Sequence, residues 1–282
     1  MSILNEIATS TRLRVNEQKH RVPLDTLRTA ALDMPKEAFL FEEALGGCAC
    51  PNAGGAGAKA GGKVPPLQSG DIKLICEIKK ASPSKGVLCE KFDYLHIAKA
   101  YESAGAAAIS VLTEPKFFQG DLRYMEEISH AVRTPLLMKD FVIDEYMLYE
   151  GKIAGANAVL LIAGLLSKEE LARFLTVADL LRLSALVETH DEKEIETALS
   201  LGARVIGVNN RDLKDFSVDL SLTEKLRKYV PADKIFVSES GIKEPADIKR
   251  LRACGVNAAL VGEAFMKVKD KKAEYKRLLG IE

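Results

Sequence analysis

Short apolar segments of the chain end in acidic, basic or amide side chains, the groups that move protons to and from a carbonyl substrate. Lys139-Asp140 follows one such segment, and Glu188 follows another. The other polar ends are Glu77 with Lys79, Asn209-Asn210-Arg211-Asp212, Ser238-Glu239-Ser240-Gly241 and Gly262-Glu263. A single charged residue in such a place is usually a solvated edge or a structural ion pair. Together the polar ends predict one acid–base site, because buried charges need partners and would face one another.

Glycines after the last two segments indicate a phosphate site. Ser240-Gly241 and Gly262-Glu263 each lead into a helical pattern, and backbone N–H groups at a helix start attract anions. Gly262 could instead simply end a strand tightly, but two neighbouring units of this kind favour phosphate. No Ser/His/Asp order is visible in the sequence, and we interpret His190 as a loop or first-turn residue.

Eight apolar, β-branched runs, each followed by an amphipathic segment and a turn, must position these side chains. Their starts lie about 20 to 35 residues apart, as strand-plus-helix units require. Continuous apolar runs are typical of parallel strands that are buried on both faces. We therefore predict an α/β fold, an eight-stranded β/α (TIM) barrel with its chemistry at the C-terminal ends of the strands, and a doubly wound open sheet is the alternative. The runs are 72–78, 107–112, 135–138, 158–162, 185–187, 205–208, 235–237 and 258–261.

The segments between the runs carry helix signals. Residues 94, 97, 98 and 101 follow the apolar spacing of a helix face, with Gly105 past its end. Two helix starts fit a capping box, Ser167 with Glu170 and Ser221 with Glu224. Gly-Ala dipeptides at 105, 155 and 202 precede strands, where glycine permits the left-handed turn that ends a helix.

We expect one domain over residues 1–282, with the barrel over 71–282. Residues 1–45 are predicted to form two or three helices that cover one end of the barrel. Residues 46–70 are rich in glycine and alanine and are predicted to be a mobile loop. Cys48 and Cys50 lie in this loop, but no histidine or second cysteine pair has metal-ligand spacing, so we favour a flexible insert over a metal site.

The composition excludes several kinds of partner. Forty basic residues balance forty acidic ones, which gives no support for binding to nucleic acid or an acidic membrane. No apolar run approaches the roughly 20 residues that span a bilayer. The N-terminus reads as an amphipathic helix and not as a signal peptide, and five cysteines in such a chain indicate reduced thiols. We expect a cytoplasmic protein that acts on a small phosphorylated molecule, as a monomer unless an oligomer is shown.

Several motifs together resemble the indole-3-glycerol phosphate synthase family, and they fall in the family's order on the predicted strands. ExKxxSPSxG, MKDF and NNRDL in combination are highly specific, whereas SESGI alone would not be. The resemblance covers nearly the whole chain outside 46–70. The matching segments are ICEIKKASPSKG (75–86), TEPKFFQGDL (113–122), LLMKDFVID (136–144), LVETHDE (186–192), IGVNNRDL (206–213), VSESGI (237–242) and VGEAFM (261–266).

The resemblance implies a reaction of tryptophan biosynthesis that needs no metal or organic cofactor. The family converts 1-(2-carboxyphenylamino)-1-deoxyribulose 5-phosphate to indole-3-glycerol phosphate, with loss of carbon dioxide and water. Ring closure needs a cation to protonate the ketone oxygen, and dehydration needs an acid for the hydroxyl and a base for a proton. The polar strand ends suit these demands.

The resemblance also implies roles for individual residues. Lys139 is the general acid and Glu188 the general base, while Lys79 holds the substrate carboxylate and is a second candidate for the acid. An acidic lysine needs a lowered pKa or a firmly held geometry, and Lys79 would lower the pKa of Lys139, opposed by Glu77 or Glu188.

The remaining implied contacts fall into three groups. The ribulose hydroxyls and the lysines are held by Glu77 and Asn209, and Glu239 and Arg211 complete the charge network. The phosphate is bound by Ser82, Ser240, Gly241, Gly262 and the backbone N–H of Glu263. The aromatic ring lies in an apolar pocket of Phe118, Phe141, Leu160 and Leu213, for which core packing is an equally simple explanation.

Two rival functions remain open at this point. Phosphoribosylanthranilate isomerase is another phosphate-binding barrel, but it relies on a Cys/Asp pair, and Cys76 lies within the first run on the face opposite Glu77. A non-catalytic barrel that binds a phosphorylated ligand would be expected to lose Lys139 or Glu188, and this chain keeps both.

Overall fold

The computed structural model describes residues 3–36, 38–46, 72–212 and 215–281. The predicted loop at 46–70, with Cys48 and Cys50, therefore lies outside the described residues except for Gly46, and so does Leu213.

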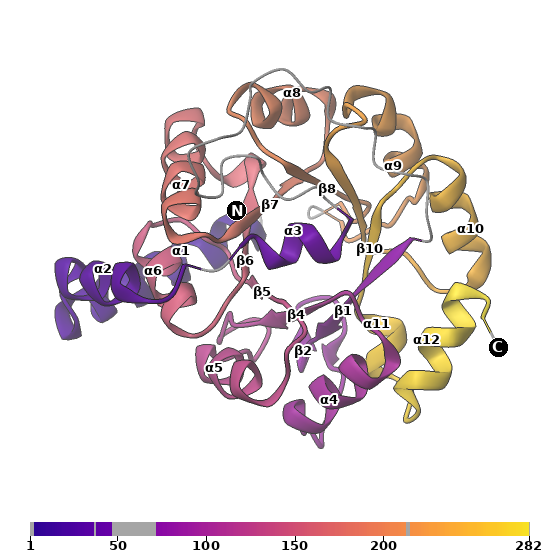
Figure 1. Ribbon diagram of the computed structural model, residues 1–282, viewed down its shortest axis with the longest axis horizontal. Helices are drawn as coiled ribbons and strands as arrows, with labels where there is room; N and C mark the ends of the chain where they lie inside the picture. Colours follow the sequence, from indigo (N-terminus) through magenta and orange to yellow (C-terminus); the bar gives the residue numbers. More distant parts are fainter. Residues whose placement is uncertain (1–2, 37, 47–71, 213–214, 282) are drawn as a thin grey trace.

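Eight parallel strands form a closed barrel in the order β1-β10-β9-β8-β7-β6-β5-β4, with β1 pairing β4 to close the ring (Figure 1). The barrel prediction is confirmed, and the open-sheet alternative is wrong. A short antiparallel hairpin, β2 (Ala81–Ser82) with β3 (Gly86–Val87), follows β1 outside the barrel. The barrel strands are β1 (Lys73–Ile78), β4 (Ala108–Leu112), β5 (Leu136–Lys139), β6 (Ala158–Ile162), β7 (Ser184–Thr189), β8 (Val205–Asn209), β9 (Ile235–Glu239) and β10 (Ala258–Val261).

Helices follow the strands and form an outer ring around the barrel (Figure 1). Two apolar layers result, one between strands and helices and one inside the barrel. The outer helices are α4 (Tyr94–Ala104), α5 (Leu122–Ala131), α6 (Tyr146–Ile153), α7 (Lys168–Leu181), α8 (Glu192–Ser200), α9 (Ser221–Leu226), α10 (Pro245–Ala253), α11 (Glu263–Met266) and α12 (Lys271–Leu279). Short 3-10 turns lie at η1 (Ala163–Leu165) and η2 (Arg227–Tyr229).

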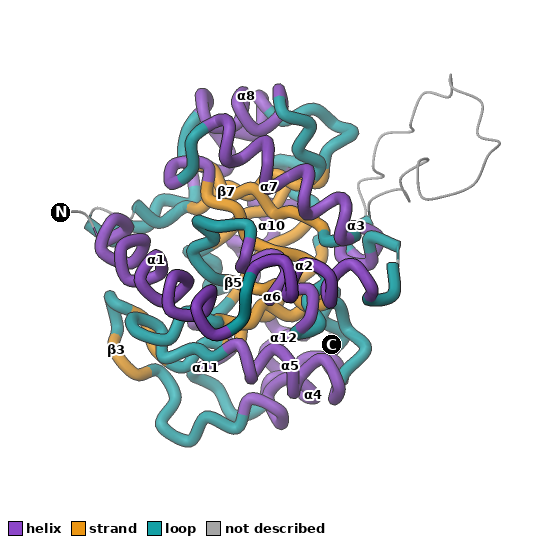
Figure 2. Tube along the Cα trace, turned by 90° about the vertical axis from the view of Figure 1, so that its left-hand side faces the viewer, coloured by secondary structure: helices purple, strands orange, loops and turns teal. Residues whose placement is uncertain are grey.

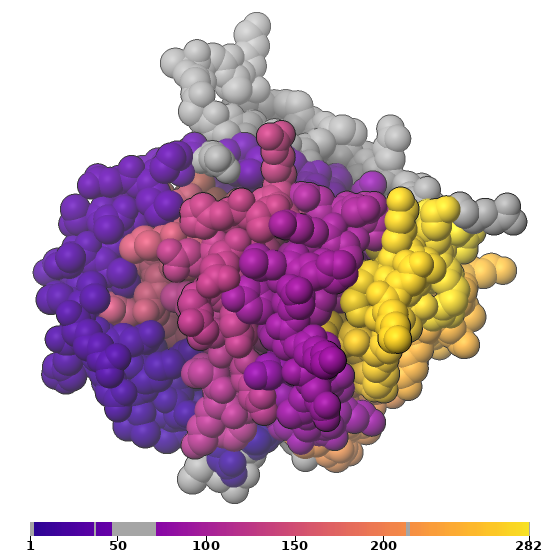
Figure 3. All heavy atoms as spheres, turned by 90° about the horizontal axis from the view of Figure 1, so that it is seen from below, coloured from indigo at the N-terminus to yellow at the C-terminus, as the bar shows by residue number. Residues whose placement is uncertain are grey.

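The C-terminal helix closes this outer ring against the first βα unit. Figure 3 shows yellow α12 packed beside the magenta segments that include α4. The Tyr275 hydroxyl donates a hydrogen bond to the Gly105 carbonyl at 2.7 Å, where α4 ends in a left-handed turn with φ of 96°.

Of the two predicted capping boxes, one is present and the other is not. Ser167 and Glu170 form the capping box that opens α7, as predicted. The second box, Ser221 with Glu224, is wrong. Asp219 accepts hydrogen bonds from the Ser221 backbone and hydroxyl, which places Ser221 inside the first turn of α9. The Glu224 carboxylate instead pairs with Arg250.

The N-terminal region forms three helices that cover both ends of the barrel, not one end as predicted. Helix α1 (Ile3–Arg21) lies on the side of the β2–β3 hairpin, and α3 (Leu40–Ala44) lies on the opposite side (Figure 2). Helix α2 (Leu24–Asp33) joins them and packs against α6. Phe41 and Leu45 are buried in the cluster that fills the barrel interior. The barrel is therefore plugged at its N-terminal end, and its C-terminal end is left for a site.

No helix among the described residues is long and apolar enough to cross a membrane.

Candidate active site

A cavity of about 300 Å³ opens at the C-terminal ends of the barrel strands. Its volume lies at the lower end of the range for small-molecule sites. All the predicted site residues that the structure describes line it: Glu77, Lys79, Ser82, Phe118, Lys139, Phe141, Leu160, Glu188, Asn209, Arg211, Glu239, Ser240, Gly241, Gly262 and Glu263. The parallel strands bring these residues together because their C-terminal ends meet at one mouth.

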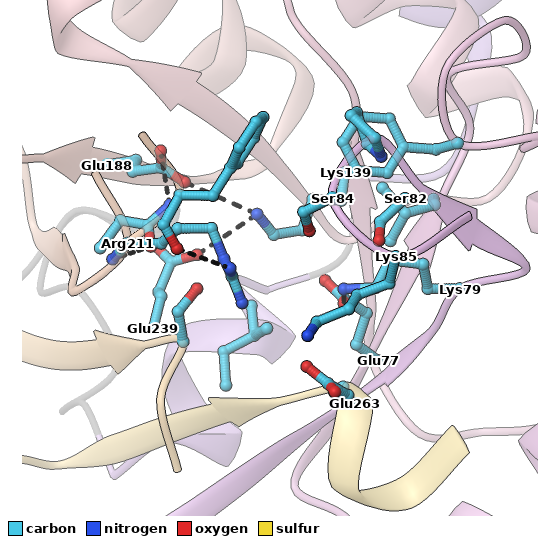
Figure 4. A pocket seen from close by; sticks show the side chains of 18 of the residues that line it. Glu77, Lys79, Ser82, Ser84, Lys85, Lys139, Glu188, Arg211, Glu239 and Glu263 are labelled. Atoms are coloured by element: carbon cyan, nitrogen blue, oxygen red, sulfur yellow. Dashed lines mark hydrogen bonds and ion pairs between the residues drawn. The ribbon is translucent and has the colours of Figure 1, made fainter. Parts of the chain in front are cut away.

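Lys139, the last residue of β5, lies between two buried carboxylates (Figure 4). Its Nζ is 3.4 Å from Glu239 Oε2 and 3.6 Å from Glu188 Oε2. Burial lowers the pKa of Lys139, but Glu239, Glu188 and Glu77 together raise it above its ordinary value. The predicted opposition of Glu77 and Glu188 to a lowered pKa is confirmed, and Glu239 adds to it. Lys139 is a firmly held, protonated ammonium group.

Lys79 is paired with a different carboxylate, because its Nζ forms an ion pair with Glu77 Oε1. Burial raises the pKa of Glu77, but Lys79 and Lys139 outweigh that effect and the pKa lies below its ordinary value. The Glu77 carboxylate occupies the space that a Cβ at Gly262 would fill. Gly262 thus has a packing reason besides the predicted phosphate contact, since any side chain there would displace Glu77.

Glu239, the last residue of β9, is a third carboxylate that acts on Lys139. Burial raises its pKa to about 7, although Lys139 opposes the rise. Neither of its carboxylate oxygens has a hydrogen-bond partner among the described residues. Glu239 therefore readily carries a proton near neutral pH.

Glu188 lies in the wall of the cavity and is held there by a hydrogen bond. Its side chain is only 3% exposed, and Asn209 Nδ2 donates a hydrogen bond to Oε1 at 3.1 Å. Strand register places Glu188 beside Gly207 of β8 and Asn209 beside Glu239 of β9. The amide of Asn209 therefore fixes the carboxylate that faces Lys139.

The turn after β9, where a phosphate contact is predicted, lines the cavity. Ser240 and Gly241 both adopt positive φ, at 67° and 87°. The buried Asn210 side chain stabilises this turn, since its Nδ2 donates to the Glu239 carbonyl at 2.9 Å and to the Ser240 carbonyl at 3.1 Å. The Glu263 carboxylate is engaged with Lys267 at 2.5 Å, an i,i+4 ion pair.

The opposite part of the cavity is apolar. The rings of Phe118 and Phe141 lie 5.9 Å apart, centroid to centroid, and Leu160 lies in the same wall. Glu114, which is buried, accepts hydrogen bonds from the backbone N–H groups of residues 116, 117 and 118 and so fixes the loop that carries Phe118.

Some residues of the site have no counterpart in the sequence prediction. Helix α1 contributes an apolar edge of the cavity through Ile3, Leu4 and Ile7. Their spacing indicates a buried helix face, but sequence alone does not say what that face covers. His190 lies against Glu188, and its i,i+2 spacing from Glu188 was an available signal of a shared strand face.

Helix α1 is anchored to the mouth by a buried carboxylate. Arg14 Nη2 lies 3.0 Å from both oxygens of Asp140, which also accepts hydrogen bonds from the Thr113 hydroxyl at 2.9 Å and the Phe141 N–H at 2.8 Å. Asp140 follows Lys139 directly, so this network also fixes the end of β5.

Replacing Arg14 by alanine is expected to loosen α1 and lower kcat/KM about tenfold, mainly through KM. The reason is that the buried Asp140 carboxylate would lose the cation that pairs with it, which costs about 1–3 kcal/mol, so α1 would dock less tightly. Steady-state kinetics with a thermal melt measure both effects. The exposed Arg12 on the same helix is the control, and Arg12→Ala should leave kcat/KM within twofold. Equal kinetics for the two variants would contradict an anchoring role for Arg14.

Among the described residues, no group of three or more His, Cys, Asp or Glu side chains could hold a metal ion. Cys76 is buried in the layer between strands and helices, on the face opposite Glu77, as its position in the sequence predicts.

The fold and this mouth define a class, the β/α-barrel enzymes with an acid–base site at the C-terminal ends of the strands. The family model described as indole-3-glycerol phosphate synthase matches residues 66–278. The chain belongs to the indole-3-glycerol phosphate synthase family, whose members are carboxy-lyases of tryptophan biosynthesis.

Relatives agree over nearly the whole chain. The indole-3-glycerol phosphate synthase of Ruminiclostridium cellulolyticum is 44% identical over 279 residues, which is 99% of each chain. That of Endomicrobium trichonymphae is 49% identical over 266 residues, covering 94% of this chain and 95% of the relative.

Solved structures show a likeness of fold alone. A 3-hexulose-6-phosphate synthase superposes with a TM-score of 0.59 at 18% identity, over 75% of this chain and all of that one. A mutant tryptophan synthase α-subunit of Pyrococcus furiosus gives a TM-score of 0.57 at 14% identity, over 75% of this chain and 99% of that one.

Proposed function

We propose that Lys139 and Glu188 are the acid and the base with which this chain closes the indole ring of indole-3-glycerol phosphate. The substrate is 1-(2-carboxyphenylamino)-1-deoxyribulose 5-phosphate. The observation that carries the proposal is the position of Lys139, 3.6 Å from Glu188 and 3.4 Å from Glu239, within a cavity that has an apolar wall and a glycine-containing turn.

The substrate is oriented by its two ends. Its phosphate binds at the Ser240-Gly241 turn and at Gly262, with Ser82 and the Glu263 N–H, because backbone N–H groups at a helix start attract an anion. Its aromatic ring lies between Phe118, Phe141 and Leu160. With both ends held, the reacting carbon is brought near the ketone, and much of the entropic barrier is removed in advance.

Ring closure is the first chemical step. The aromatic carbon that bears the carboxylate attacks the ketone carbon, and Lys139 gives its proton to the ketone oxygen, which becomes a hydroxyl. The raised pKa of Lys139 keeps that proton on the ammonium group until the oxygen gains negative charge. Lys79 holds the substrate carboxylate, and Arg211 adds positive charge to the network.

Loss of the carboxylate and loss of water complete the reaction. Departure of carbon dioxide returns its bonding electrons to the ring system. The ammonium group of Lys79, the second candidate for the acid, then protonates the departing hydroxyl, while Glu188 takes a proton from the methylene carbon bonded to nitrogen so that the indole becomes aromatic. Glu77 and Asn209, which line the cavity, hold the hydroxyl groups of the ribulose part of the substrate.

Indole fluorescence tests the proposal directly. Purified protein incubated with the carboxyphenylamino-deoxyribulose phosphate is expected to give a rising indole signal, and the dephosphorylated compound is expected to give far less. Absence of signal from folded protein would overturn the function. A signal equally strong without phosphate would overturn the phosphate site.

We also propose that the chain works as one domain and as a monomer in the cytoplasm. The described cysteines, Cys76, Cys89 and Cys254, are free thiols, which suits a reducing compartment. Light scattering that gives a mass near 30.8 kDa, together with a single unfolding transition, is the expected result.

A further inference from the structure

His190 lies behind Glu188, outside the cavity lining, at the point where β7 ends. Its Nε2 is 3.6 Å from Glu188 Oε1, and its Nδ1 is 3.4 Å from Glu194 Oε2 on α8. The His190 backbone N–H also donates to Glu194 Oε2, at 2.7 Å. The imidazole thus bridges the proposed base inside the barrel and a carboxylate on an outer helix.

The two ring nitrogens of His190 make different interactions. Nε2 is buried and has no hydrogen-bond partner among the described residues, so its interaction with Glu188 is an attraction between charges. The side chain as a whole is 25% exposed, which leaves a route for exchange of protons with water. Glu194 fixes the ring through both the backbone and the side chain.

Three carboxylates act on the charge of His190: Glu188 on β7, Glu194 on α8 and Glu239 on β9. Lys139 lies on the far side of Glu188. Burial lowers the pKa of His190, but Glu194 and Glu188, with a contribution from Glu239, outweigh burial and raise it. His190 is therefore a cation at mildly acidic pH.

We propose that His190 is a positioning residue for Glu188, and that its imidazolium, anchored by Glu194, keeps the Glu188 carboxylate ionised and aimed at the cavity. This inference rests on the proposed role of Glu188 as the base. His190 and Asn209 both approach Oε1, which leaves Oε2 on the side of Lys139. His190 can hold Glu188 in this way without touching the substrate.

The charge of His190 matters most where Glu188 would otherwise gain a proton. Glu188 shares Lys139 with Glu239, and two carboxylates so placed compete for one cation. A second cation beside Oε1 favours the ionised form of Glu188. Its removal lets protons bind Glu188 at higher pH, so activity is lost earlier as the solution is acidified.

The pH dependence of kcat for His190→Asn tests this inference, with indole fluorescence as the readout. We expect the acidic limb to move up by about one pH unit, which lowers kcat about tenfold at pH values on that limb. On the alkaline plateau kcat should fall by no more than about threefold, because Glu188 is ionised there in either case. KM should stay within twofold throughout.

Two further variants provide a second test and a control. Glu194→Gln removes the anchor and is expected to move the acidic limb in the same direction by a smaller amount. His96→Asn, an exposed histidine on α4, should leave the profile unchanged. If His190→Asn does not fold, the result for Glu194→Gln decides, and an unmoved limb there would overturn the proposal.

The role of His190 can be disproved while Glu188 is still the base, and the two outcomes can be told apart. An acidic limb that stays in place in His190→Asn, or a uniform loss of kcat at every pH, would overturn the role of His190 while Glu188→Gln remained inactive. Wild-type turnover in Glu188→Gln would instead remove the base assignment on which the inference rests.

Discussion

Replacing Lys139 by alanine is expected to lower kcat about a thousandfold while the barrel stays folded. The ketone oxygen would then gain negative charge with no ammonium group to protonate it, and Glu188 and Glu239 would face each other without the cation between them. Burial already raises the pKa of Glu239 to about 7, so Glu239 can take up a proton and relieve that repulsion. Steady-state indole fluorescence and a thermal melt measure the two effects.

Lys139→Arg separates the charge of this residue from its proton. Arginine keeps a cation near both carboxylates but does not release a proton in the accessible pH range, so substrate affinity should be kept and kcat should still be lost. Lys116→Ala, at an exposed position outside the cavity lining, controls for general effects of losing a lysine. More than a tenth of wild-type kcat in Lys139→Ala would contradict the general-acid role.

The mouth of the barrel could be predicted because strand direction alone determines where its polar residues meet. Lys139 and Glu188 are 49 positions apart in the chain, yet parallel pairing through β6 places them side by side. The strand limits were less accurate. Strand β7 continues through Glu188 and Thr189, beyond the predicted end at residue 187, because backbone pairing and not side-chain polarity ends a strand.

Contacts between distant elements could not be predicted in this way. The apolar face of α1 indicates burial, but it does not indicate that Ile3, Leu4 and Ile7 border the cavity. The same holds for Phe41, whose place inside the barrel depends on the path of the chain between α2 and β1. The effect of Glu239 on the pKa of Lys139 was not predicted either, because only side-chain geometry shows that this carboxylate lies 3.4 Å from Lys139 Nζ.

Replacing Glu188 by glutamine is expected to lower kcat at least a hundredfold, with KM changed little. Glutamine has nearly the same shape and can still accept the hydrogen bond that Asn209 donates, so the wall of the cavity should keep its form. It cannot take a proton from the intermediate, however, and the dehydrated ring could not become aromatic. The kinetic measurement is kcat and KM from indole fluorescence over a range of pH.

The pattern of the loss distinguishes a base from a binding group. Removing a base lowers kcat and kcat/KM together, whereas removing a binding contact raises KM and leaves kcat unchanged. A raised KM with wild-type kcat in Glu188→Gln would therefore assign Glu188 to binding. Glu192→Gln, at an exposed position at the start of α8, should change neither value. Because the glutamine has no carboxylate to protonate, any acidic limb that remains in Glu188→Gln must come from another group, for which buried Glu239 is the nearest candidate.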